Sequence, residues 1–109
     1  MLFDVRTVTS DGRDLVVVIG DVDLATIPSL RAQLDRADGR QVVLDLTGVD
    51  LFDPLAFGAV IAASLRATRR NAHFAVVCPA GRPRELFAES GVDRILTVVE
   101  HVDALGPPR

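Results

Sequence analysis

The chain has 109 residues, of which 49% are hydrophobic and 25% charged. This profile is typical of one globular domain with a single core. Fifteen acidic and 12 basic residues give a formal charge of −3, which argues against a nucleic-acid or anionic-lipid partner because phosphates attract positive charge. No apolar stretch approaches the roughly 20 residues that a membrane crossing needs, and the first residues do not resemble a signal peptide. We therefore expect a cytoplasmic protein without membrane insertion.

Residue types associated with catalysis are sparse and poorly spaced. His73 and His101 have no neighbour at metal-ligand spacing, no glycine motif resembles a phosphate loop, and no serine lies in a G-x-S-x-G elbow. All 12 basic residues are arginine, so lysine-dependent chemistry is excluded. The single Cys78 ends an apolar run, which predicts a small buried core residue. These patterns predict a non-enzymatic protein with no metal and no cofactor.

In chain order, the first elements predicted are two strands joined by a turn. Alternation over residues 3–7 indicates a strand with one exposed face, and the apolar run 15–19 indicates a more central strand buried on both faces. The turn Ser10-Asp11-Gly12 between them predicts an antiparallel hairpin. A short amphipathic helix follows over residues 28–37, begun near Thr26 and stopped by Gly39.

The rest of the chain alternates between strands and helices. Residues 42–46 predict a third strand, 54–70 a helix, 74–78 a strand, 84–90 a helix ended by Gly91, 95–98 a last strand and 102–105 a terminal turn. Such alternation requires crossover connections and hence parallel strands. The prediction is a single α/β domain over residues 1–105. It has a mixed, mostly parallel sheet of four to five strands with an N-terminal antiparallel hairpin, three to four helices, and a short flexible tail over 106–109.

The start of the second predicted helix has an unusual exposed face. Asp53 suits the N-cap and Pro54 the first helical position. A helical wheel places Phe57, Val60, Ile61, Ser64, Leu65 and Thr68 toward the core, and leaves Leu55, Gly58, Ala59, Ala62 and Ala63 on the solvent side. A solvated face normally carries charge, so this strip indicates partner docking, cover by another part of the same chain, or the use of alanine simply as a good helix former.

Three segments resemble the STAS domains of anti-sigma-factor antagonists. They are GDVDLATIP at residues 20–28, residues 42–53 with the helix that follows, and LFAESGVDRIL at residues 86–96. The resemblance spans nearly the whole chain. It implies a STAS fold and a non-enzymatic protein that docks on a serine-kinase anti-sigma factor and so releases a sigma factor.

The resemblance also implies a site. In the family, the aspartate that ends the loop after the third strand precedes a serine that the kinase phosphorylates to switch binding off. Here Asp53 is followed by Pro54, which has no hydroxyl, and the next family positions are Leu55-Ala56-Phe57-Gly58. Asp23 matches a partner-contacting acid. The predicted partner-binding residues are Asp21, Asp23, Thr26, Asp53, Pro54, Leu55, Gly58, Ala59 and Ala62.

Several alternatives stay open at this stage. Loss of the phosphoacceptor is consistent with a permanently binding antagonist, but also with a scaffold or accessory subunit of a larger assembly without kinase switching. A small-molecule-binding or catalytic domain is a further alternative, which rests on fold analogy alone. The hydroxyls of Thr26 and Thr47 could accept a phosphate in place of the missing serine, but they are more simply interpreted as cap and turn groups. The sequence leaves the oligomeric state open, a homodimer included.

Overall fold

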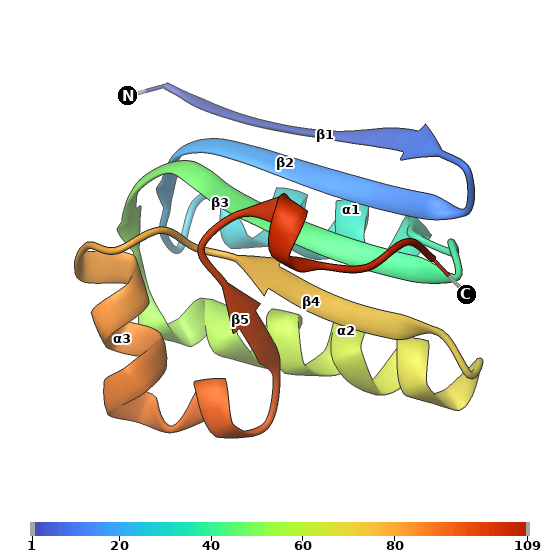
Figure 1. The fold of residues 1–109 in the computed structure, drawn as a ribbon. Helices are drawn as coiled ribbons and strands as arrows, with labels where there is room; N and C mark the ends of the chain where they lie inside the picture. The colour runs from blue at the N-terminus through green and yellow to red at the C-terminus, as the bar shows by residue number, and fades with distance from the viewer. Residues whose placement is uncertain (1, 109) are drawn as a thin grey trace.

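A computed structural model describes residues 2–108 of the chain. Five strands form one sheet in the order β1-β2-β3-β4-β5 (Figure 1). Their bounds are Phe3–Ser10 for β1, Arg13–Val22 for β2, Gln41–Phe52 for β3, His73–Val77 for β4 and Thr97–Val99 for β5. The β1–β2 pair is antiparallel and the other three pairs are parallel. The predicted fold class, a mixed sheet with an N-terminal hairpin, is confirmed.

Three α-helices connect the parallel strands. They are α1 (Ile27–Arg36), α2 (Phe57–Arg69) and α3 (Arg82–Ser90), and short 3-10 turns are η1 (Pro54–Ala56), η2 (Val92–Arg94) and η3 (Val102–Ala104). Gly91 ends α3 with φ of 79°, the left-handed conformation expected of a glycine cap. The helix predicted over 54–70 is thus divided, because its first turn is 3-10 and the α-helix begins at Phe57.

The core lies between the sheet and the helices that cover one of its faces. Figure 1 shows α1 and α2 on one side of β2 and β3, while the segment after β5 crosses the other side. In β2, Val16 and Val18 are buried, but Leu15, Val17 and Ile19 are only half-buried. The expectation that this strand is buried on both faces was wrong, since helices cover a single face.

The second half of β3 is irregular. Its register against β2 shifts between Val17 and Ile19 and again between Gly20 and Asp21, so β3 contains extra residues at two places. Each extra residue shifts the alternation of side chains by one position. As a result Leu51 is exposed at the end of the strand and Phe52 is buried.

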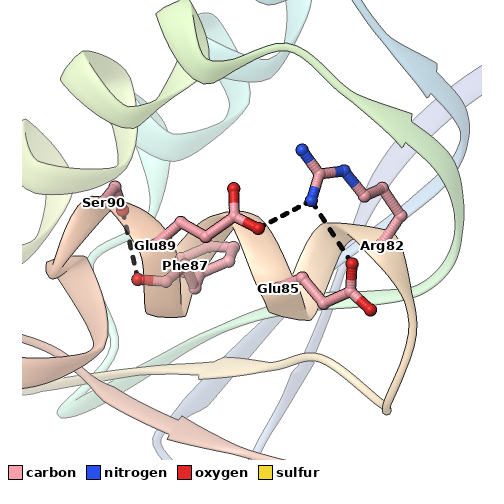
Figure 2. Close-up of polar contacts among 5 residues, drawn as sticks. All are labelled: Arg82, Glu85, Phe87, Glu89 and Ser90. Atoms are coloured by element: carbon pink, nitrogen blue, oxygen red, sulfur yellow. Dashed lines mark hydrogen bonds and ion pairs between the residues drawn. The ribbon is translucent and has the colours of Figure 1, made fainter.

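Helix α3 separates a charged surface from a buried ring. Arg82 donates to Glu89 at 2.8 Å and to Glu85 at 3.3 Å, and all three side chains are exposed. These carboxylates raise the pKa of the Arg82 guanidinium above its ordinary value. Figure 2 shows the three charged side chains together, and it also shows Ser90 donating to the Phe87 carbonyl oxygen. Phe87 itself is fully buried in the core.

The last described residues lie on the sheet face away from α1 and α2. The carbonyl oxygen of Gly106 accepts hydrogen bonds from Arg13 Nη2 at 3.0 Å and from Gln41 Nε2 at 3.3 Å. Ile95, which was expected in the last strand, lies before β5 and is exposed. Cys78 is buried as predicted, and burial raises the pKa of its thiol while Arg84 partly opposes this shift.

Candidate functional site

The turn between β3 and α2 is held in place by its buried ends. Phe52 ends β3 and Phe57 begins α2, and both rings are buried. Between them, Asp53 Oδ1 accepts a hydrogen bond from the Leu55 N–H at 2.9 Å, and Pro54 occupies the first helical position of η1. The predicted cap at Asp53 is therefore confirmed. Pro54 and Leu55 remain exposed on the outside of the turn.

Three phenylalanine rings beneath this turn form one cluster. The centroid of Phe57 lies 5.1 Å from that of Phe52 and 4.9 Å from that of Phe87, and Phe52 and Phe87 are 5.5 Å apart. The tilted and edge-on arrangements are those that aromatic pairs favour. The cluster joins the end of β3, the start of α2 and the middle of α3, so it fixes the position of the turn.

The turn that precedes α1 has a reciprocal set of hydrogen bonds. Asp23 Oδ1 accepts from the N–H groups of Ala25 and Thr26, and the Asp23 N–H donates to Thr26 Oγ1 at 2.9 Å. The Thr26 hydroxyl also donates to the Asp21 carbonyl oxygen at 2.8 Å. Asp23 and Thr26 thus stabilise the chain where it leaves β2, as expected of cap residues.

An apolar groove lies beside these two turns. Its volume is about 420 Å³, and it is lined by Leu24, Ile27, Pro28, Arg31, Ala32, Asp35 and Leu55. Leu24 is 69% exposed and Leu55 62% exposed, so two large aliphatic side chains from different turns are exposed along one groove. We use the name apolar rim for the exposed residues Leu24, Pro28, Pro54, Leu55 and Gly58.

Leu24 and Pro28 were not among the predicted site residues. The signal was present, because Leu24 is a large aliphatic residue in the turn between Asp23 and Thr26. The groove itself depends on how closely α1 approaches η1, and single-sequence patterns carry no information on that approach.

The predicted exposed strip on α2 needs correction. Ala59 is 2% exposed and Ala63 is also buried, whereas Leu65, expected toward the core, is 51% exposed. Helices α1 and α2 lie in contact, and Arg66 Nη2 pairs with Asp35 Oδ1 at 2.8 Å across them. The solvent side of α2 is therefore rotated from the predicted one, and only Leu55, Gly58 and the half-buried Ala62 of the strip stay accessible.

The remaining predicted residues differ in accessibility. Asp21 is buried, and Asp23 and Asp53 are half-buried.

Within residues 2–108 no three histidine, cysteine or acidic side chains come together as a metal site would require. No helix of the described chain is long and apolar enough to span a membrane.

The sheet order, the hairpin at its start and the turn that caps the second helix together define a STAS domain. Residues 5–100 match the family model described as "Mlab, STAS domain". Because this match covers most of the chain, the protein belongs to that family. No curated protein sequence gives a significant match.

Solved structures with the same fold include anti-sigma factor antagonists. An anti-sigma factor antagonist from Mycobacterium paratuberculosis superposes with a TM-score of 0.87 at 20% identity, covering 94% of this chain and 90% of that one. A putative anti-sigma factor antagonist from Thermotoga maritima gives 0.78 at 15% identity, with 94% and 89% covered. The Bacillus protein SpoIIAA, an anti-sigma factor antagonist, gives 0.74 at 13% identity in its unphosphorylated form, with 94% and 92% covered.

Proposed function

We propose that this chain is a non-enzymatic binding module that docks on a protein partner through the apolar rim. The observation that carries the proposal is the pair Leu24 and Leu55, two aliphatic side chains that border one groove and are more than half exposed. Clustered apolar side chains with this exposure are typical of an interaction surface. Neither η1 nor the first turn of α2 carries an acidic residue, and the charged side chains beside the rim are those of Arg31 and Asp35 in the lining of the groove.

For the partner, we propose a serine-kinase anti-sigma factor. Support comes from the resemblance of residues 20–28 and 42–53 to antagonist sequences, and from the fold shared with anti-sigma factor antagonists. Asp23 holds its turn through hydrogen bonds while remaining half-buried, so one edge of its carboxylate is available to a partner. The proposed partner acts where transcription takes place, which puts the chain in the cytoplasm.

The proposal includes the absence of a phosphate switch at the usual position. Pro54 stands where the family carries the phosphorylated serine, and its ring has no hydroxyl. The nearby hydroxyl of Thr26 is engaged with the Asp21 carbonyl oxygen and the Asp23 N–H, which supports a structural role for it. Docking would then be regulated by the amounts of the proteins or by another route.

Calorimetric titration against kinase-type anti-sigma factors encoded beside this chain tests the proposal. We expect saturable one-to-one binding with a dissociation constant below about 100 μM. Binding weaker than that for every such kinase would contradict the choice of partner.

A second candidate is an accessory subunit of a larger assembly that does not use kinase switching. Two observations favour it, the loss of the phosphoacceptor at Pro54 and the match to the family described as "Mlab, STAS domain". Co-purification separates the two candidates. An accessory subunit should elute in a stable stoichiometric complex from gel filtration, whereas an antagonist should exchange between free and bound forms.

A further inference from the structure

Strand β1 is one edge of the sheet and lacks most of the features that keep edge strands from pairing. Its eight residues pair with β2 without a register shift. Within residues 2–108, no strand pairs with its outer side. Natural edges are protected by charged side chains, proline, bulges or shortness. Of these, β1 has only the charged side chains of Asp4 and Arg6, which are opposite in sign. The opposite edge strand, β5, has only three residues.

The exposed side chains of β1 alternate in charge and polarity. Phe3 and Val5 pack against the core, while Asp4, Arg6 and Val8 are exposed on the opposite face. Leu2, directly before the strand, is 75% exposed and Val8 is 50% exposed. One face of this edge thus presents, in order, an aliphatic, an acidic, a basic and an aliphatic side chain.

Antiparallel pairing of two identical strands allows few registers. In an antiparallel pair, two residues directly opposite each other direct their N–H and C=O groups either both toward the other strand or both away from it. Two identical strands therefore pair symmetrically about one residue, the central residue, which lies opposite its own copy. Centring on Asp4 would oppose two aspartates, and centring on Arg6 would oppose two arginines. Like charges directly opposite each other destabilise a pair.

Centring on Val5 gives a complementary partner to both charged side chains and to both large aliphatic side chains of the exposed face. Asp4 then lies opposite Arg6 of the second copy, and Arg6 opposite Asp4, which makes two opposite-charge pairs. Leu2 lies opposite Val8 in the same register, so the exposed aliphatic side chains also meet. Centring on Phe3 or Thr7 leaves both charges without an opposite partner.

We propose that two copies of this chain associate through β1, antiparallel and centred on Val5, into a homodimer with one continuous sheet. The two-fold axis is perpendicular to the sheet, so the helices of both copies lie on the same face. Such an interface uses the same patch on both subunits, as most homodimers do. It does not depend on the apolar rim or on the identity of a docking partner.

Sedimentation velocity of the full chain and of two charge-reversed variants tests this register. The unmodified chain should sediment as a dimer at about 0.5 mM and dissociate on dilution. Asp4→Arg places arginine opposite arginine and Arg6→Asp places aspartate opposite aspartate, so each variant alone should dimerise at least about tenfold more weakly. Asp4 and Arg6 are exposed, and the circular dichroism spectra should not change.

Sedimentation of a mixture of the two variants is the decisive test of the register. An equimolar mixture opposes arginine to aspartate at both pairs, so the dimer should return. Asp103→Arg and Arg94→Asp reverse the same charges at exposed positions outside β1 and should leave the dimer intact. An unmodified chain that remains monomeric at about 0.5 mM, single variants that dimerise normally, or a mixture that remains monomeric would each overturn the proposal.

Discussion

Replacing Phe87 by alanine tests whether the aromatic cluster anchors the turn between β3 and α2. Phe87 is 0% exposed and packs on Phe52 and Phe57 with centroid distances of 5.5 Å and 4.9 Å. Removal of a buried phenylalanine costs about 3–5 kcal/mol, since apolar burial is lost and a cavity remains. A domain of 109 residues has a free energy of unfolding of about 5–15 kcal/mol, so the variant should retain only part of its stability.

Urea unfolding followed by far-ultraviolet circular dichroism measures this loss, because the chain has no tryptophan or tyrosine to report by fluorescence. An unfolding entropy of about 2.1 cal/mol/K per residue means that a loss of about 4 kcal/mol lowers Tm by about 15–20 °C. Phe74→Ala is the matched control, because Phe74 is half-buried and lies outside the cluster. Equal losses for the two variants would refute the argument that the cluster is a special anchor.

Three further predictions concern substitutions of Pro54, Gly58 and Asp14. Pro54→Ser restores a hydroxyl, so incubation with a binding kinase and ATP should add one phosphate to the intact mass of this variant and none to the unmodified chain. Gly58→Ala should raise the free energy of unfolding by up to about 1 kcal/mol, because a Cβ at this position meets no atom within 4 Å; a lower thermal midpoint would contradict this. Burial tends to raise the pKa of Asp14, but its hydrogen bonds from Thr9 and two backbone N–H groups lower it overall. The folded pKa is therefore below the unfolded one, so the stability gained from the ionised form is complete above about pH 4 and is lost as the pH falls through the folded pKa. The free energy of unfolding of Asp14→Asn should be lower than that of the unmodified chain near pH 7. Denaturation at several pH values should show this difference becoming smaller as the pH falls.

The sequence patterns were sufficient for the order and type of the elements. Turn residues at Ser10-Asp11-Gly12, the cap at Asp53 and the glycine at Gly91 each mark a boundary that the structure confirms. These are local signals, in which a residue type meets a requirement of its own backbone. The parallel arrangement also followed, because alternating strands and helices permit few topologies.

The solvent side of α2 could not be predicted in this way. A helical wheel weighs residue types, and alanine is equally consistent with exposure and with a tight helix contact. Ala59 and Ala63 are buried and Leu65 is exposed, because the neighbouring helix and the 3-10 first turn set the rotation of α2. Of the predicted strip, only Leu55 and Gly58 belong to the apolar rim, and Leu24 of the rim comes from a different turn.

The extra residues in β3 could not be predicted from the sequence either. Alternation along residues 42–52 gives no sign of the two register shifts against β2. Those shifts leave Leu51 exposed and Phe52 buried, and so they place the Phe52 ring in the cluster beneath the turn. Single-sequence periodicity assumes an unbroken pleat, and it fails where the pleat is interrupted.

Comparison of two leucine variants in the same calorimetric titration tests the docking surface most directly. Leu55 is 62% exposed in the apolar rim, and Leu65, in the α-helix that follows η1, is 51% exposed outside the rim. Burial of a leucine of this exposure is worth about 1–2 kcal/mol, so Leu55→Asp should weaken binding by at least about tenfold. Leu65→Asp should bind as the unmodified chain does, with both variants equally stable. Equal affinity of the two variants, or loss of binding only for Leu65→Asp, would contradict docking through the apolar rim.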